Sequence, residues 1–154
     1  MPSIHSDTEF KSALSGLPLN QQRSVGKLFV GSVIDLSDSP KVKKAIDAIG
    51  DTDLSADDIA ENFQTAKSVA IDSYTLCGRE ADWLKQASHF VASAAAVCLT
   101  PEDQVSQCGG TLAWSTAMNA RMAKNCEAIA HGQESDSEEA SRQHQILTTF
   151  LKTA

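Results

Sequence analysis

The sequence predicts an all-α protein, a compact single-domain bundle of about six to seven helices. Three observations support this fold class. Apolar residues recur in steps of three and four along most of the chain, and no segment alternates apolar and polar residues as a half-buried strand does. Pro, Gly and capping residues divide the chain into pieces of helix length. The 154 residues are enough for one domain, and 42% of them are apolar, as in ordinary globular proteins.

The first predicted helix lies within residues 1–16. Ser6 and Glu9 form a capping box, in which each side chain can satisfy a backbone N–H of the other residue. Gly16 ends the segment. Because this helix is short, we expect it to be docked only loosely on the rest of the protein.

The second predicted helix opens at Leu17-Pro18-Leu19-Asn20 and contains two glycines, Gly26 and Gly31. Each glycine costs about 1 kcal/mol relative to alanine inside a helix, so its presence needs a reason. We expect a neighbouring helix to approach closely at these positions. The apolar stripe of this helix consists of Val25, Leu28, Phe29, Val33 and Leu36.

The third and fourth helices have clear boundary signals. Pro40 takes the first position of the third helix, where its missing N–H is harmless, and Gly50 ends this helix. The fourth follows an acidic connection, starts at Ser55 and runs to about Cys77. Its buried face is marked by Ile59, Phe63, Ala66, Ala70, Tyr74 and Cys77.

The fifth and sixth helices differ in character. The fifth, from residues 80–83 to Leu99, is rich in alanine and serine. Its small side chains would let neighbouring helices pack closely, which suits a central position. The sixth has a strong start signal, with Thr100 as cap and Pro101 at the first position. The pair Gly109-Gly110 either kinks this helix or delays its effective start.

Residues 133–154 are predicted to form an exposed acidic linker followed by a last helix. Its apolar edge, which docks on the body of the protein or on a partner, consists of Ile146, Leu147, Phe150 and Leu151. The chain therefore divides into a short N-terminal helix (1–16), a helical core domain (17–132) and a linker with a C-terminal helix (133–154).

Charge and hydropathy exclude several classes of function. With 20 acidic and 13 basic residues the net charge is −7, which argues against a nucleic-acid-binding protein. No apolar stretch reaches 18 residues, and the N-terminus does not resemble a signal peptide. We therefore expect a cytoplasmic protein that does not bind membranes.

Acidic residues concentrate at the start of the fourth helix. An EF-hand calcium loop beginning at Asp51 fails, because Ala56 replaces the required glycine and Asn62 the bidentate acid. The carboxylates are therefore interpreted either as helix caps on a wet surface or as a recognition patch for a basic partner. The candidate partner-binding residues are Asp51, Asp53, Asp57, Asp58 and Glu61.

No catalytic residue, metal ligand or cofactor is predicted. The cysteines Cys77, Cys98, Cys108 and Cys126 form no C-x-x-C motif and are interpreted as reduced, buried side chains. His89 has no partner at metal-ligand spacing and is interpreted as a hydrogen-bonded boundary residue. A second candidate surface is an apolar face of the sixth helix, interpreted as core unless uncovered, and formed by Trp114, Met118 and Met122.

Three segments carry a resemblance to a known family: Leu19-Asn20-Gln21-Gln22-Arg23, Ala66-Lys67-Ser68-Val69-Ala70, and the small-residue segment 87–94. Together with the alanine-rich helices between Leu17 and Gly132, they resemble helical immunity proteins of bacterial polymorphic-toxin systems. The resemblance implies a protein that binds and neutralises a toxin, with its acidic surface facing a basic enzyme.

The sequence thus favours a non-catalytic cytosolic protein that binds a protein partner through an acidic surface. One alternative is a helical bundle, either an enzyme or a binding protein, that holds a small molecule or a metal in a site built from residues distant in sequence. The other alternative is a homo-oligomeric structural subunit. Such a subunit would bury the Gly26/Gly31 face and the face of Trp114, Met118 and Met122 between protomers.

Overall fold

The computed structural model describes residues 4–49, 55–76, 82–108, 111–133 and 138–153. Within these ranges the chain contains α-helices and short 3₁₀ helices and no strand, so the predicted all-α fold is confirmed. The elements are α1 (Asp7–Ser15), α2 (Leu19–Val33), η1 (Ile34–Leu36), α3 (Pro40–Asp47), α4 (Ala56–Leu76), α5 (Trp83–Cys98), η2 (Glu102–Cys108), α6 (Leu112–Ala130) and α7 (Glu139–Thr153).

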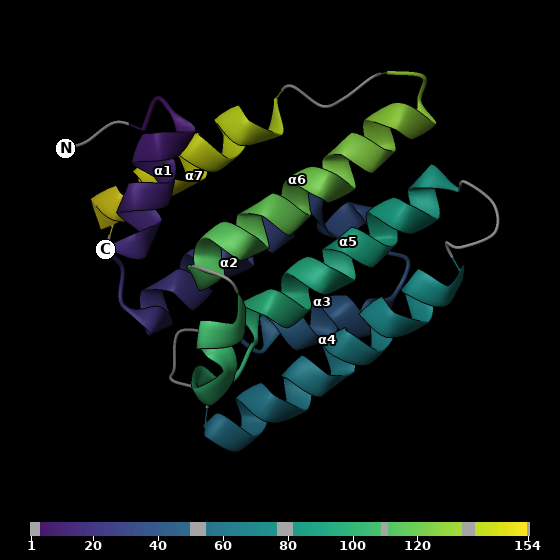
Figure 1. The fold of residues 1–154 in the computed structure, drawn as a ribbon, viewed down its shortest axis with the longest axis horizontal. Coiled ribbons are helices and arrows are strands. Elements are labelled where there is room, and N and C mark those ends of the chain that lie inside the picture. Colours follow the sequence, from purple (N-terminus) through teal and green to yellow (C-terminus); the bar gives the residue numbers. More distant parts are fainter. Residues whose placement is uncertain (1–3, 50–54, 77–81, 109–110, 134–137, 154) are drawn as a thin grey trace.

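Helix α5 lies at the centre of the bundle. It packs most extensively on α6 and α4, and these three helices lie side by side in one layer (Figure 1). Helices α2 and α3 lie behind this layer, and both contact α5. The alanines of α5 are buried on several sides, which confirms that its small side chains let neighbouring helices approach.

The two terminal helices close a second core beside α6. Phe10 and Leu14 of α1 are completely buried, so the prediction that this helix docks loosely is wrong. The Ser6 hydroxyl accepts a hydrogen bond from the Glu9 N–H at 3.2 Å, which confirms the predicted cap. Helix α7 docks on the body of the protein through the predicted apolar edge. The edge residues that pack in this core are Ile146, Leu147, Phe150 and Leu151.

The sixth helix begins later than its strongest start signal suggests. Residues 102–108 form a 3₁₀ helix, and α6 begins at Leu112. The Thr100 hydroxyl donates to the Ala96 carbonyl at 3.2 Å, so this side chain serves the end of α5 instead of capping α6. Continuing a helix through Gly109-Gly110 would cost about 1 kcal/mol per glycine, which explains why the delayed start is preferred to a kink.

Helix α2 is joined to α5 by a buried arginine. The guanidinium of Arg23 donates to the carbonyls of Cys98 and Thr100 at 2.9 and 2.7 Å. These carbonyls lie at the C-terminal end of α5, where intrahelical donors run out and the helix dipole favours a positive charge. The side chain is only 7% exposed, so it replaces water as the donor for these groups.

The two helical glycines of α2 have different surroundings. A Cβ added to Gly26 would lie 2.8 Å from the Cys98 Sγ and 3.5 Å from a methyl carbon of Thr116, so α2 approaches both α5 and α6 closely here. A Cβ added to Gly31 would meet nothing within 4 Å. Close helix packing therefore explains Gly26, as predicted, but does not explain Gly31.

Substitution of these two glycines by alanine should have opposite effects on stability. Gly26→Ala should destabilise the protein by about 1–3 kcal/mol, because the new methyl group overlaps the Cys98 sulfur. Gly31→Ala should stabilise it by about 0.5–1 kcal/mol, because open space lets alanine lower the entropy of the unfolded chain. Urea unfolding followed by circular dichroism measures both, and effects of the same sign would contradict the described packing.

Replacement of the buried arginine should be among the most damaging changes in α2. Arg23→Met keeps the side-chain volume but removes two buried hydrogen bonds from a charged donor, so we expect a loss of about 2–4 kcal/mol in unfolding free energy. Lys43→Met, which removes an exposed ion pair on α3, is the control and should change stability by less than about 1 kcal/mol. Equal effects of the two variants in urea unfolding would show that Arg23 does not hold α5.

Candidate functional site

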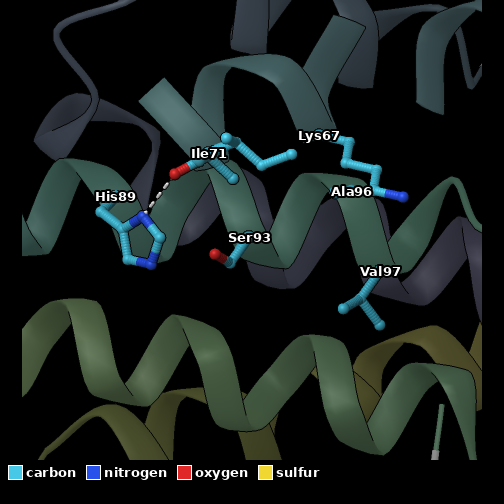
Figure 2. Close-up of a pocket in the computed structure, with 7 residues that line it drawn as sticks. Lys67, Ile71, His89, Ser93, Ala96 and Val97 are labelled. Carbon is cyan, nitrogen blue, oxygen red and sulfur yellow. Dashed lines mark hydrogen bonds between the residues drawn. The ribbon is translucent and has the colours of Figure 1, made fainter. Parts of the chain in front are cut away.

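A shallow apolar pocket lies between α4 and α5. Its volume is about 390 Å³, within the range of roughly 300–1,000 Å³ typical of small-molecule sites. Figure 2 shows His89, Ser93 and Val97 along α5, with Lys67 and Ile71 of α4 opposite them. The complete lining is Lys67, Ala70, Ile71, His89, Ser93, Ala96 and Val97.

The pocket exists because small side chains meet where the two helices pack. Ala70 and Ala96 leave space that larger residues would fill, and Ile71 is 55% exposed instead of covering it. Sequence reasoning missed this site. Ala70 belongs to the correctly predicted buried face of α4, but helical periodicity does not reveal how two buried faces fit together.

His89 forms one wall of the pocket through a hydrogen bond across the helices. Its Nδ1 lies 2.8 Å from the Ala70 carbonyl, and because a carbonyl only accepts, Nδ1 carries the proton and donates (Figure 2). The ring also meets Phe90 edge-on, with centroids 5.3 Å apart. The prediction of a hydrogen-bonded boundary residue is confirmed.

Two other polar groups belong to residues that line the pocket, the Lys67 ammonium and the Ser93 hydroxyl. Within the described residues, neither the Lys67 ammonium nor the Ser93 hydroxyl has a hydrogen-bond or ion-pair partner. Lys67 does place its Nζ 5.5 Å from the centre of the Phe63 ring, a cation–π contact. Other helical hydroxyls, such as those of Thr116 and Thr148, donate to the carbonyl four residues earlier, so Ser93 is unlike them.

The predicted acidic patch is described in part. Asp57, Asp58 and Glu61 are exposed near the start of α4, and in the described part of the protein their carboxylates form no ion pair or side-chain hydrogen bond. The helix is capped instead by Ser55, whose hydroxyl accepts from the Asp58 N–H at 3.1 Å. Asp51 and Asp53 lie outside the described residues.

The second predicted surface is divided between core and solvent. Trp114 and Met118 are half-buried against the second core, and the Trp114 ring lies 5.9 Å from that of Phe10. Met122 is 44% exposed. The structure therefore places Trp114 and Met118 in a helix–helix interface, whereas Met122 is exposed to solvent.

A polar junction that sequence reasoning missed ties the two terminal helices to α6. Arg121 of α6 binds both carboxylate oxygens of Asp7 at 2.8 and 3.0 Å, and donates through Nε to the Gln143 side chain at 2.7 Å. His144 places its Nε2 2.9 Å from the same Asp7 carboxylate. The hydrogen bond from Arg121, helped by His144, lowers the pKa of Asp7 to about 2.

The described residues offer little for covalent or metal chemistry. Cys98 and Cys126 are buried and outside any disulfide, as predicted. Burial raises the pKa of the Cys98 thiol to about 12, so it stays protonated and is not a nucleophile at neutral pH. The Cys77 and Cys108 side chains lie outside the described part of the protein.

The described ranges show neither a metal site nor a membrane-spanning helix. They contain no group of three or more His, Cys, Asp or Glu side chains placed to hold a metal ion. None of the helices in these ranges combines the length and apolar character that crossing a membrane requires.

No protein-family model, curated protein or solved structure that was compared with this chain matches it. The resemblance to immunity proteins therefore stays a prediction.

The polar junction should make stability depend on pH in the acid range. The folded-state pKa of Asp7, about 2, is below the ordinary value of 3.8. The Asp7 charge therefore contributes to the free energy of unfolding above pH 4, and this contribution is lost as the pH falls towards 2. The difference in unfolding free energy between wild type and Asp7→Asn should shrink over this interval. Asp7 is half exposed and solvent screens its charge, so the total change should be at most about 1 kcal/mol.

Urea unfolding at pH 6, 4, 3 and 2 checks this expectation. The ion pair between Asp7 and Arg121 is partly exposed, so salt screens it. The difference in unfolding free energy between wild type and Asp7→Asn should therefore also decrease in high salt. A difference between the two proteins that stays constant from pH 6 to pH 2 would show that Asp7 does not stabilise the junction through its charge.

Proposed function

We propose that the protein is a non-catalytic binding protein that recognises a basic protein partner through the acidic start of α4. The observation that carries this proposal is the exposure of three carboxylates, those of Asp57, Asp58 and Glu61, within two turns of one helix and without an ion-pair partner among the described residues. Clustered charge of one sign steers and orients an oppositely charged partner.

Folding alone explains this cluster incompletely. Asp57 and Asp58 lie in the first turn of α4, where the helix dipole favours negative charge. Glu61 lies beyond that turn and is four residues from Asp57, a spacing at which like charges destabilise a helix by about 0.2–0.5 kcal/mol. The third carboxylate is therefore better explained by an interaction with another molecule than by helix stability.

The position of α4 favours access by a partner. This helix lies at the edge of the layer formed with α5 and α6, and it packs chiefly on α5 and α3 (Figure 1). Its outward residues, among them Asp57, Glu61 and Gln64, are exposed. A partner can therefore reach the carboxylates without any rearrangement of the bundle.

The proposal places the protein in the cytoplasm and, following the sequence resemblance, includes neutralisation of a basic toxin as one form of the activity. Cys98 and Cys126 support a reducing compartment, since both are buried thiols outside disulfides. An inhibitor of this kind needs no catalytic residue, only a surface that occupies the partner's site.

Neutralising the patch should weaken capture of the partner. The triple variant Asp57→Asn, Asp58→Asn, Glu61→Gln should retain at least tenfold less of a basic protein than wild type in affinity capture from cells that produce this protein naturally. Capture by wild type should also fall as salt is raised from 50 to 300 mM, because the attraction is screened. Quantitative mass spectrometry of the captured proteins measures both effects.

A matched control separates the patch from net charge. Asp35→Asn, Asp47→Asn, Glu138→Gln changes the charge equally at exposed positions on other elements and should capture the partner as wild type does. Binding of the purified partner by isothermal titration calorimetry then confirms the difference in Kd. Equal capture by the two triple variants would overturn the acidic surface as the binding site, and a captured enzyme that stays fully active in the complex would overturn the inhibitor role.

A further inference from the structure

We infer that the pocket between α4 and α5 binds a small apolar carboxylate, such as a short aliphatic or single-ring aromatic acid. This site is separate from the acidic start of α4 and does not depend on the proposed protein partner. It gives specific support to the small-molecule alternative that the sequence leaves open. The inference combines the shape of the pocket, its apolar walls and the sign of its charge.

The walls of the pocket favour an apolar group. Ala70 and Ile71 of α4, together with Ala96 and Val97 of α5, line a volume of about 390 Å³. Ile71 leaves more than half of its surface in contact with water, so a bound hydrocarbon chain or ring would remove apolar area from water on both molecules. The volume is near the lower end of the range for small-molecule sites, which fits a small ligand.

The polar groups of the pocket favour an anion over a cation. Among the described residues that line the pocket, Lys67 is the one with a formal charge, and none is Asp or Glu. Its ammonium contacts the Phe63 ring but has no ion-pair partner in the described residues, and the Ser93 hydroxyl has no hydrogen-bond partner there, so both can donate to a ligand. A carboxylate accepts from both kinds of donor, whereas an ammonium group would be repelled by Lys67.

His89 limits the orientation of the ligand. Its Nδ1–H is occupied by the Ala70 carbonyl, so the ring closes the pocket near Ser93 instead of offering that proton to the ligand (Figure 2). Lys67 and Val97 lie towards the other end. The charged end of the ligand therefore belongs at Lys67, and its hydrocarbon part extends along Ile71 and the small residues of α5.

The test compares three probes that share one hydrocarbon chain: octanoate, octan-1-ol and octan-1-amine. Each is titrated into the ¹⁵N-labelled full chain below its micelle concentration, and binding is followed by ¹H–¹⁵N correlation spectra. Octanoate should shift the amide signals of Ala70, Ile71, Ser93 and Val97 saturably, with a Kd about tenfold lower than that of octanol. Octan-1-amine should bind more weakly than octanol.

Two variants at exposed positions separate charge from apolar contact. Lys67→Met should raise the Kd of octanoate to that of octanol while leaving octanol unchanged. Ile71→Ser should raise the Kd of both compounds at least threefold. Lys41→Met removes an exposed charge from α3 and is the matched control, with no expected change in binding.

Either of two results would overturn the inference. Equal affinity for the three probes would show that the pocket does not select an anion, and octanoate shifts that map away from α4 and α5 would show that it is not the site. Failure here is distinguishable from failure of the proposed function, because the acidic triple variant should bind octanoate as wild type does.

Discussion

The packing of α2 against the end of α5 is the constraint on which the rest of the structure depends. Gly26 lets the α2 backbone approach the Cys98 sulfur, and Arg23, one turn earlier, supplies donors to carbonyls that α5 leaves unsatisfied. Close contact and buried polar pairing thus occur at the same place. Because α5 is held there, its two sides are available to α4 and α6, and the three helices form one layer (Figure 1).

A second group of polar interactions attaches the ends of the chain. Asp7 and His144, 137 residues apart, meet over Arg121, and Gln143 is completely buried beside them with its amide donating to the Ala117 carbonyl. This junction holds α1 and α7 on the far side of α6 from α4. As a result, neither terminal helix lines the pocket between α4 and α5.

The two candidate surfaces on α4 have opposite electrostatic character. The carboxylates near its start favour a cationic partner, whereas the pocket contains Lys67 and no acid, and therefore favours an anion. Glu61 and Lys67 are six residues apart, about 9 Å along a helix, so both surfaces could be occupied together. A ligand in the pocket would then lie close enough to a partner on α4 to change the surface which that partner contacts.

The sequence by itself determined the helices, the caps of α1 and α4 and most of the buried faces, because helical periodicity and capping chemistry act over three or four residues. It also predicted the central position of α5, since small side chains permit close packing whatever the neighbour. Only the tertiary structure decided the role of Arg23, the junction at Arg121, the burial of Phe10 and Leu14, and the pocket between α4 and α5. Each of these depends on which faces meet and in what register, and contacts between residues distant in the chain leave no local pattern.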